Sequence, residues 1–217
     1  MNVTNIFLIR HGDVDNPQEV IYDGTISLSE LGKQQLRLLG QFFRENGIIP
    51  DAVVSSPYLR TMQSSLEILS NYSDLNIPLE QDSRLQDPDF PDLVGKPLSW
   101  VLDKIVDPYT HPDMLGWRIE RPQSFTARMM AAINDVLTKY KSKTVFIVSH
   151  GDPTAFAMWQ LLHPGMPLPS IRELRNKNNR FAYLEKGEAW KIVFDEQGRV
   201  VDPEHVLINK ISLTRSV

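Results

Sequence analysis

The sequence contains no cysteine among its 217 residues. Disulfides, thiolate nucleophiles, zinc-thiolate centres and iron-sulfur clusters are therefore excluded. Long apolar runs are missing as well, and none approaches the roughly 18 residues that a membrane-spanning helix needs. The first ten residues have neither a basic start nor a small-residue cleavage site, so we expect no secretory signal and a cytoplasmic location.

Positive charge is also in short supply. Lysine and arginine number 23 against 27 aspartates and glutamates, which gives a formal net charge of -4. Nucleic acids and membrane surfaces usually require a basic face, so we expect neither as a partner. With 41% hydrophobic and 23% charged residues, the composition is that of an ordinary globular protein, and the length suits one domain spanning residues 1–217.

Two short apolar runs end in the same way. Residues 6–9 lead into Arg10 and His11, and residues 145–148 lead, one serine later, into His150. A Gly-Asp pair follows each histidine. Four apolar residues are too few for a helix and suit a buried parallel strand, and ligands bind at the carboxyl ends of such strands. We therefore expect both histidines at one edge of one sheet.

Helical and strand patterns alternate along the rest of the chain. Helices are expected at residues 27–47, 57–69, 122–140 and 153–163, and strands at 51–55, 77–80, 180–184 and 189–194, the last two joined as a hairpin. This alternation predicts an α/β fold, a three-layer sandwich with a mostly parallel central sheet and helices on both faces. Residues 83–121 contain five prolines and indicate a lid insertion of loop and helix, with its helix at 98–106.

Cap residues and apolar stripes give the expected ends and faces of these helices. The first helix is expected to start near Ser27 or Ser29, and Ser27 with Glu30 fits a capping box. Ser56 fits the N-cap of the second helix, and Asp152 fits that of the last. The stripes expected in the core are Leu31, Leu38, Leu39, Phe42 and Phe43 in the first helix and Leu59, Met62, Leu66 and Leu69 in the second. Arg60 lies off that second stripe, either in a phosphate cradle at the helix start or on the solvated surface.

If they converge, Arg10, His11, Arg60 and His150 form a site for phosphoryl transfer that needs no metal and no cofactor. A neutral imidazole is a competent nucleophile, and guanidinium forks match phosphate oxygens. The reaction needs mainly an in-line nucleophile and positive charge around the phosphorus. A carboxylic acid must still protonate the leaving oxygen.

Four segments together carry a familiar pattern: Arg-His-Gly at 10–12, Leu-Ser-Glu-Leu-Gly-Lys-Gln-Gln at 28–35, Val-Ser-Ser-Pro-Tyr-Leu-Arg-Thr at 54–61 and Val-Ser-His-Gly at 148–151. In this order they resemble the motifs of the histidine phosphatase superfamily, which includes the cofactor-dependent phosphoglycerate mutases. The resemblance spans about the first 70% of the chain. It implies that His11 becomes phosphohistidine while Arg10, Arg60 and His150 hold the phosphoryl group.

The resemblance also places the general acid after an Arg-Leu pair, and residues 84–87 (Arg-Leu-Gln-Asp) put Asp87 at that position. Glutamate is usual there, so Asp89 and Asp13 stay open as proton donors. Asn16 would be the family's substrate-binding asparagine, moved one place along the chain. The shift of the asparagine falls around the substrate rim and not in the phosphate pocket, so it makes the family's known substrates poor guides.

We therefore expect a metal-independent phosphatase acting on a small phosphomonoester. A phosphoglycerate-type mutase is one alternative, but it would need extra cations to grip a bisphosphate, and residues 82–113 are basic only at Arg84, Lys96 and Lys104. A second is a metal-dependent hydrolase whose two His-Gly-Asp segments hold a divalent ion. A third is a protein that binds a phosphorylated ligand without turnover. A homodimer is compatible with each of these.

Overall fold

The computed structural model describes residues 2–99, 107–110, 116–176, 183–202 and 210–211. The elements are, in chain order, β1 (Thr4–Arg10), α1 (Glu30–Glu45), β2 (Ala52–Ser55), α2 (Leu59–Leu69), η1 (Ser70–Tyr72), β3 (Leu79–Gln81), η2 (Ser83–Leu85), α4 (Pro122–Lys139), β4 (Thr144–Ser149), α5 (Gly151–Leu162), α6 (Ile171–Arg175), β5 (Ala189–Phe194) and β6 (Lys210–Ile211). The predicted alternation of strands and helices is confirmed.

Within the described residues the strands form one sheet in the order β3-β2-β4-β1-β5-β6. The first four of these are mutually parallel, whereas β5 runs antiparallel to β1, and β6 antiparallel to β5. The β1 and β4 register ends with Arg10 opposite Ser149. The next residue of each strand is a histidine, so His11 and His150 leave the sheet side by side at its carboxyl edge.

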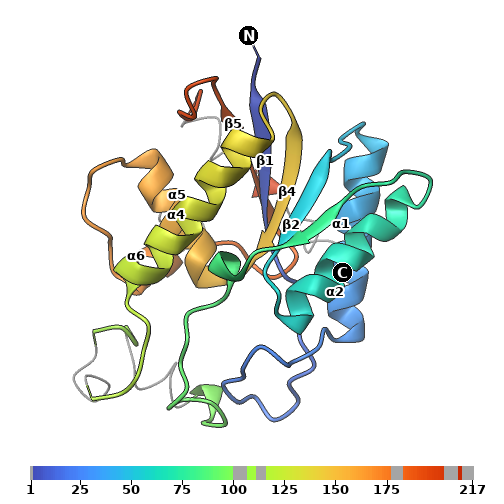
Figure 1. Ribbon diagram of the computed structural model, residues 1–217. Helices are drawn as coiled ribbons and strands as arrows, with labels where there is room; N and C mark the ends of the chain where they lie inside the picture. Colours follow the sequence, from blue (N-terminus) through green and yellow to red (C-terminus); the bar gives the residue numbers. More distant parts are fainter. Residues whose placement is uncertain (1, 100–106, 111–115, 177–182, 203–209, 212–217) are drawn as a thin grey trace.

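Helices cover both faces of this sheet, with α1 and α2 on one side and α4 and α5 on the other (Figure 1). Phe7 and Ile9 of β1 pack in the core under α1 and α2. Ile6 and Leu8, which point the opposite way because side chains alternate along a strand, pack in the core under α4 and α5. The three-layer sandwich predicted from the sequence is confirmed.

The buried face of α1 differs from the predicted one. Leu31 and Leu38 are 56% and 44% exposed, and Leu36 lies in the core instead. The cap is Ser29, whose hydroxyl accepts the amide of Gly32. Of the two predicted starts, the one near Ser29 is therefore confirmed, whereas the capping box at Ser27 was wrong because a bridge between residues 14 and 28 keeps the chain extended beyond that serine.

The α2 helix buries its polar face, which reverses the prediction. Leu59 and Leu66 are 42% and 57% exposed. The polar side chains that are buried in their place are Arg60, Thr61, Ser64 and Ser65. The hydroxyls of Ser64 and Ser65 donate to carbonyl groups four residues earlier in the helix. Because the backbone satisfies both hydroxyls, this face can enter the interior without leaving them unpaired.

Two helix starts also differ from prediction. The α2 helix begins at Leu59, with Tyr58 as N-cap, and the hydroxyl of Ser56 instead shares a hydrogen bond with His150 and accepts the Tyr58 amide at 3.4 Å, ahead of the helix. The α5 helix begins at Gly151 with His150 as its N-cap, two residues before the predicted start. His150 therefore lies at the junction of a strand and a helix N-terminus.

The second strand of the predicted hairpin, at residues 189–194, is confirmed as β5, whereas most of its predicted partner at 180–184 falls outside the described part of the chain. Residues 180–182 lie outside the described residues, and β5 pairs with β1 on one edge and β6 on the other. Among the described residues, the neighbours of β5 are thus β1, near the start of the chain, and β6, the next strand in chain order.

The described part of the predicted lid crosses below the carboxyl ends of the strands (Figure 1). The amide of Ile21 donates to the Lys96 carbonyl at 2.8 Å, and the Gly95 amide donates back to Ile21 at 2.8 Å. These two backbone hydrogen bonds join the loop after β1 to the lid. Most of the predicted helix at 98–106 lies outside the described residues. Within the described parts of the chain, none of the helices combines the length and the hydropathy needed to cross a bilayer.

Candidate active site

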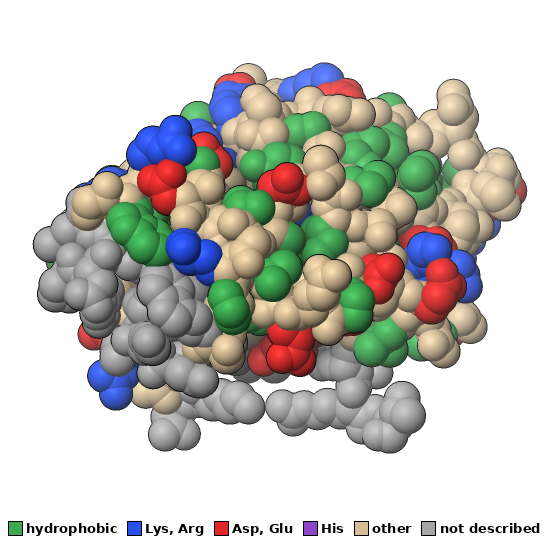
Figure 2. All heavy atoms as spheres, turned by 90° about the horizontal axis from the view of Figure 1, so that it is seen from below, with side chains coloured by type: hydrophobic (Ala, Val, Ile, Leu, Met, Phe, Trp, Pro, Cys, Tyr) green, Lys and Arg blue, Asp and Glu red, His purple; other side chains and the backbone are tan. Residues whose placement is uncertain are grey.

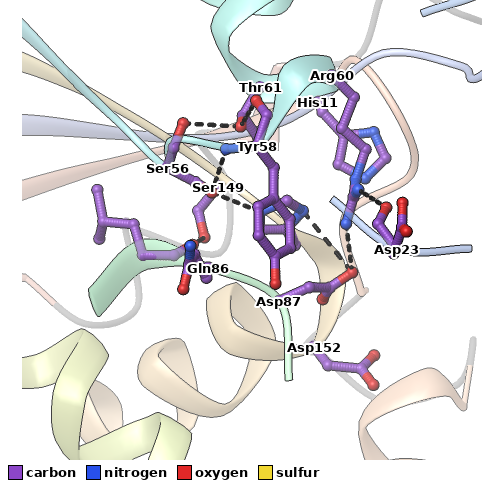
Figure 3. A network of polar contacts seen from close by, with 12 residues as sticks. His11, Asp23, Ser56, Tyr58, Arg60, Thr61, Gln86, Asp87, Ser149 and Asp152 are labelled. Carbon is purple, nitrogen blue, oxygen red and sulfur yellow. Dashed lines mark hydrogen bonds and ion pairs between the residues drawn. The ribbon is translucent and has the colours of Figure 1, made fainter. Parts of the chain in front are cut away.

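His11 and His150 meet at the ends of β1 and β4. Their ring centroids are 5.3 Å apart in an edge-to-face arrangement, and both side chains are buried. Arg10 is the last residue of β1, and Arg60 lies in the first turn of α2 beside His11 (Figure 3). The four residues that the sequence predicted to converge do so.

His11 has the geometry of a nitrogen nucleophile. Its Nδ1 lies 2.7 Å from the carbonyl oxygen of Gly12. A carbonyl can only accept, so Nδ1 carries the proton and the lone pair of Nε2 is left for attack. Burial, followed by the positive charges of Arg60 and Arg10, holds the pKa of His11 well below its usual value. The ring is therefore neutral, and nucleophilic, at neutral pH.

His150 is held differently. Its Nε2 shares a hydrogen bond of 2.9 Å with the Ser56 hydroxyl. Its Nδ1 lies 3.7 Å from a carboxylate oxygen of Asp87. Burial and then the charge of Arg60 lower the pKa of His150 well below the ordinary range. The ring is thus a fixed neutral group at the start of α5, where the helix dipole also favours an anion.

Arg60 is the central cation of the site. Its side chain is 1% exposed, and one terminal nitrogen donates to the Asp23 carbonyl at 2.9 Å while the other donates to Asp87 at 2.9 Å. Figure 3 shows the guanidinium between these two acceptors. The rings of Tyr22 and Tyr58 lie 5.2 and 5.0 Å from its carbon atom. The surface alternative for this arginine is excluded.

Arg10 supplies a second cation near His11. Its Nη1 donates to the Leu184 carbonyl at 2.7 Å, and its guanidinium lies 5.1 Å from the Tyr183 ring. Within the described residues, the buried polar atoms that lack a hydrogen-bond partner include the Nε atoms of Arg10 and Arg60 and the Nδ1 of His150. All three belong to side chains that surround His11, as expected of groups that bind an oxyanion.

Asp87 lies where a proton donor would have to be. Its carboxylate contacts Arg60 (Figure 3), and one of its oxygens lies 3.7 Å from Nδ1 of His150. Burial raises the pKa of Asp87, and the nearby Arg60 only partly opposes this shift. Asp13 is a weaker candidate: burial alone would raise its pKa, but hydrogen bonds from Lys186 and Ser29 outweigh this and lower it.

The other two predicted groups lie at the margins. Asp89 lines a smaller hollow of about 450 Å³ behind Asp87 and is not among the residues that line the cavity in front of His11. Asn16 does line that larger cavity. However, its amide nitrogen donates to the Val20 carbonyl at 2.8 Å and its oxygen accepts the Val20 amide at 3.3 Å. Both polar atoms of the Asn16 side chain are thus hydrogen-bonded to the backbone of its own loop.

The cavity in front of His11 has a volume of about 1310 Å³, enough for a small organic phosphate. Aromatic and apolar residues of the lid form part of its wall, among them Phe90, Leu93 and Leu98. Figure 2 views the molecule from this end of the strands. On the coloured part of this face, apolar side chains are interspersed with acidic and basic ones, and neither charge gathers into a single patch.

Sequence reasoning missed a buried carboxylate beside this cavity. Asp152 accepts hydrogen bonds from Arg175 at 2.8 Å, from Tyr109 at 2.5 Å and from Tyr183. Burial would raise the pKa of Asp152, but the charge of Arg175 and these bonds lower it. It ties Tyr109 of the lid to the first turn of α5, to Arg175 of α6 and to Tyr183. In the sequence, this aspartate was interpreted as a helix cap or, within its His-Gly-Asp segment, as a ligand of the metal-hydrolase alternative, and neither interpretation indicated its bonds to Arg175, Tyr109 and Tyr183.

Two glycines determine how close α1 comes to the end of β1. A Cβ atom on Gly12 would lie 2.4 Å from Leu36 and 2.5 Å from the Gly32 carbonyl oxygen. A Cβ atom on Gly32 would lie 2.0 Å from the carbonyl oxygen of Asp13. The Gly12 amide also donates to the Ser64 hydroxyl at 3.2 Å. The chain just after His11 is therefore packed directly on the backbone of α1.

The metal-hydrolase alternative requires several ligands at one point. Across the described ranges, no group of three or more histidine, aspartate or glutamate side chains is arranged to hold a metal ion. Asp13 and Asp152, which follow the two histidines, are instead bound to Lys186 and to Arg175. The pairing of these carboxylates with cations favours the metal-free interpretation.

Comparison with known proteins agrees with this geometry. The family model of the histidine phosphatase superfamily (branch 1) matches residues 6–193. The uncharacterized phosphatase PhoE of Bacillus subtilis (strain 168) is 27% identical over 192 residues, which cover 88% of this chain and 93% of the relative. A 2,3-bisphosphoglycerate-dependent phosphoglycerate mutase of Tropheryma whipplei (strain Twist) is 25% identical over 173 residues, covering 68% and 78%.

The fold matches solved structures over nearly its whole length. The structure of Bacillus stearothermophilus YhfR superimposes with a TM-score of 0.73 at 22% identity, and the match covers 91% of this chain and 94% of that one. The superfamily model also includes both histidine-bearing strand ends within the residues it matches. This chain belongs to the histidine phosphatase superfamily.

Proposed function

We propose that this protein is a metal-independent phosphatase that hydrolyses a small phosphomonoester through a phosphohistidine on His11. One observation carries the proposal: the His11 ring is buried and neutral, its Nδ1 is bound to a carbonyl, and its Nε2 is free among two arginines and His150. Such a group can attack phosphorus at neutral pH without a metal ion.

The reaction has two steps. The Nε2 lone pair of His11 attacks phosphorus in line with the ester oxygen, and the P–O bond breaks as Asp87 gives its proton to the leaving alcohol. Arg10, Arg60 and His150 stabilise the charge on the phosphoryl oxygens. In the second step water attacks the phosphohistidine, the P–N bond breaks, and the Asp87 carboxylate takes the proton from the water. Inorganic phosphate leaves, and both side chains return to their first state.

The charges of the cavity support a phosphatase over a mutase. Beyond Arg10, the described cations of its wall are each paired with a carboxylate of this chain: Arg175 with Asp152, Lys186 with Asp13 and Lys210 with Glu188. Exposed carboxylates line the same cavity without an ion pair to any residue that the structure describes, and they are Asp15, Glu19 and Glu185. A second phosphate would meet these negative charges.

The lid cations do not change this balance. Arg84 is paired with Asp82 and Asp135 and does not line the cavity. Lys96 lies 5.1 Å from the ring of Trp117, and Lys104 lies outside the described residues. We therefore propose, as its small phosphorylated partner, a monophosphate whose alcohol carries no second anionic group. The Tropheryma whipplei mutase relative keeps phosphoglycerate transfer as the second candidate.

The test measures phosphate release from a panel of phosphorylated metabolites with excess EDTA present. We expect metal-independent release and, after a rapid alkaline quench with labelled substrate, an acid-labile label on His11. Loss of activity in EDTA would favour the metal-dependent hydrolase. Phosphoglycerate interconversion faster than phosphate release would favour the mutase. Vanadate binding without turnover of any ester between pH 4 and 8 would leave only a phosphate-binding role.

A further inference from the structure

Arg128 of α4 holds the backbone that carries Asp87. All five N–H donors of its guanidinium are used within the described residues. Nη1 donates to the carbonyls of Arg84 and Gln86, each at 2.7 Å, and Nη2 donates to the Asp87 carbonyl at 3.2 Å. The remaining bonds go from Nε and Nη2 to the carboxylate of Glu120, at 2.9 and 2.7 Å.

Of the backbone carbonyls of residues 84–87, Arg128 binds all but that of Leu85, which a different side chain holds. The Leu85 carbonyl accepts the hydroxyl of Ser149 at 2.8 Å, and Ser149 is the last residue of β4, directly before His150. Four successive carbonyls, from residue 84 to residue 87, are therefore fixed by two side chains. One comes from α4 and the other from the strand that carries His150.

This stretch has little secondary structure of its own to hold it. The short helix η2 ends at Leu85, and its last backbone hydrogen bond runs from the Gln86 amide to the Ser83 carbonyl at 3.2 Å. Asp87 lies beyond it, in a segment with no strand neighbour among the described residues. The position of the carboxylate relative to His150 thus depends on bonds that come from elsewhere in the fold.

We propose that Arg128 is a positioning residue for the general acid and that Ser149 is its second anchor. The proposal rests on the proposed function, in which Asp87 protonates the leaving alcohol. Shortening Arg128 releases three of the four carbonyls and lets the carboxylate drift from its place beside His150 and Arg60. A displacement of about 1 Å at a catalytic group can cost on the order of 10²-fold in rate.

The variants Arg128→Met and Arg128→Lys separate positioning from general stability. We compare two esters, 2,4-dinitrophenyl phosphate, whose leaving group needs no proton, and ethyl phosphate, whose leaving group does. We expect Arg128→Met to lower kcat by roughly 30- to 100-fold on ethyl phosphate and by less than about threefold on the aryl ester. Arg128→Lys keeps the charge but not the planar fork, so its loss should be similar.

Two further variants complete the set. Ser149→Ala should show the same selective loss at a smaller size, roughly fivefold, because it frees one carbonyl. Arg37→Met is the matched control, since it also removes an arginine that donates through Nε and Nη2 to a glutamate, here Glu67 on the far side of α2. It should change neither ester's kcat, and melting temperatures of all four variants report any loss of folding.

Chemical rescue gives a second readout. The hollow of about 450 Å³ behind Asp87 is lined by Arg128, Glu120 and Asp87 itself, so a guanidinium ion has a route to the place of a deleted side chain. We expect guanidinium chloride at millimolar concentration to raise the ethyl phosphate kcat of Arg128→Ala at least threefold. Sodium chloride at the same ionic strength should not.

The outcomes are distinct. Equal losses on both esters, or no loss on ethyl phosphate, overturn the positioning role. Wild-type protein that turns over neither these two esters nor any member of the panel of phosphorylated metabolites overturns the proposed function, and the positioning role with it. Selective loss on ethyl phosphate with rescue by guanidinium supports it, even if the methionine variant melts at a lower temperature.

Discussion

The carboxyl ends of β1 and β4 carry the same His-Gly-Asp sequence but present their histidines in different ways. After β1 the chain enters a loop, and the His11 ring is fixed through Nδ1 by the carbonyl of Gly12. After β4 the chain enters α5, and the His150 ring is fixed through Nε2 by Ser56. The first arrangement leaves Nε2 for attack, whereas the second leaves Nδ1 facing Asp87. The element after each strand, together with the ring nitrogen that is bound, decides the role of the histidine.

The strongest test of this comparison replaces the proposed nucleophile. His11→Asn should lower kcat by on the order of 10⁴-fold or more, because it removes the imidazole whose Nε2 is left for attack on phosphorus. Measuring phosphate release and the trapped phosphohistidine together checks this. A label that persists in the variant would mean that the two histidines have been assigned the wrong way round.

Arg60→Ala should produce the next largest effect, on binding. Losing a charge-assisted contact to phosphate should weaken vanadate affinity by about 2 to 4 kcal/mol. Titration of vanadate by calorimetry measures it. Arg37→Ala is the control for losing an arginine. An unchanged vanadate affinity would show that Arg60 serves Asp87 alone and does not touch the phosphoryl group.

His150→Asn should lower kcat by on the order of 10²-fold, since it removes one stabilising group and leaves the nucleophile intact. In contrast to the His11 variant, it should still form the phosphohistidine, only more slowly. Single-turnover quench experiments distinguish the two. If neither variant can be labelled, the two strand ends are equivalent in the chemistry and the comparison fails.

The smallest effect concerns pH. Because burial raises the pKa of Asp87, its protonated form persists to higher pH, and kcat on an alkyl phosphate should fall about tenfold per pH unit above that pKa. The pKa of His11 is lowered, so kcat should not fall as pH drops through the usual histidine range. Asp87→Asn should abolish the fall at high pH and spare aryl phosphates. A fall that survives this substitution would assign the proton to another group.

The sequence was sufficient for the framework of the site. Short buried strands ending in histidine could be recognised because four apolar residues bounded by polar ones suit a parallel sheet. Their convergence followed from the common direction of the strands. Periodicity was less informative for α2, because it identifies residues that share a face and not which face is buried. The hydroxyls of Ser64 and Ser65 made the polar face the inner one.

The remaining features depend on partners far apart in the chain. Nothing near Arg128 indicates that its guanidinium binds carbonyls about 40 residues earlier. Likewise, the pattern of β5 shows a strand but cannot name β1 and β6 as its neighbours. Such contacts are settled by the packing of whole layers, so single-sequence reasoning has no local signal for them.

The backbone contact between Gly12 and α1 has a consequence for how the enzyme could acquire new substrates. Since not even a methyl group fits between Gly12 and Gly32, the floor beneath the nucleophile cannot be remodelled by side-chain replacement. Variation that accommodates a larger or smaller alcohol must come from the opposite wall, through residues such as Phe90 and Leu98. Directed evolution of specificity should therefore randomise the lid residues of the cavity wall and leave the carboxyl end of β1 and the start of α1 unchanged.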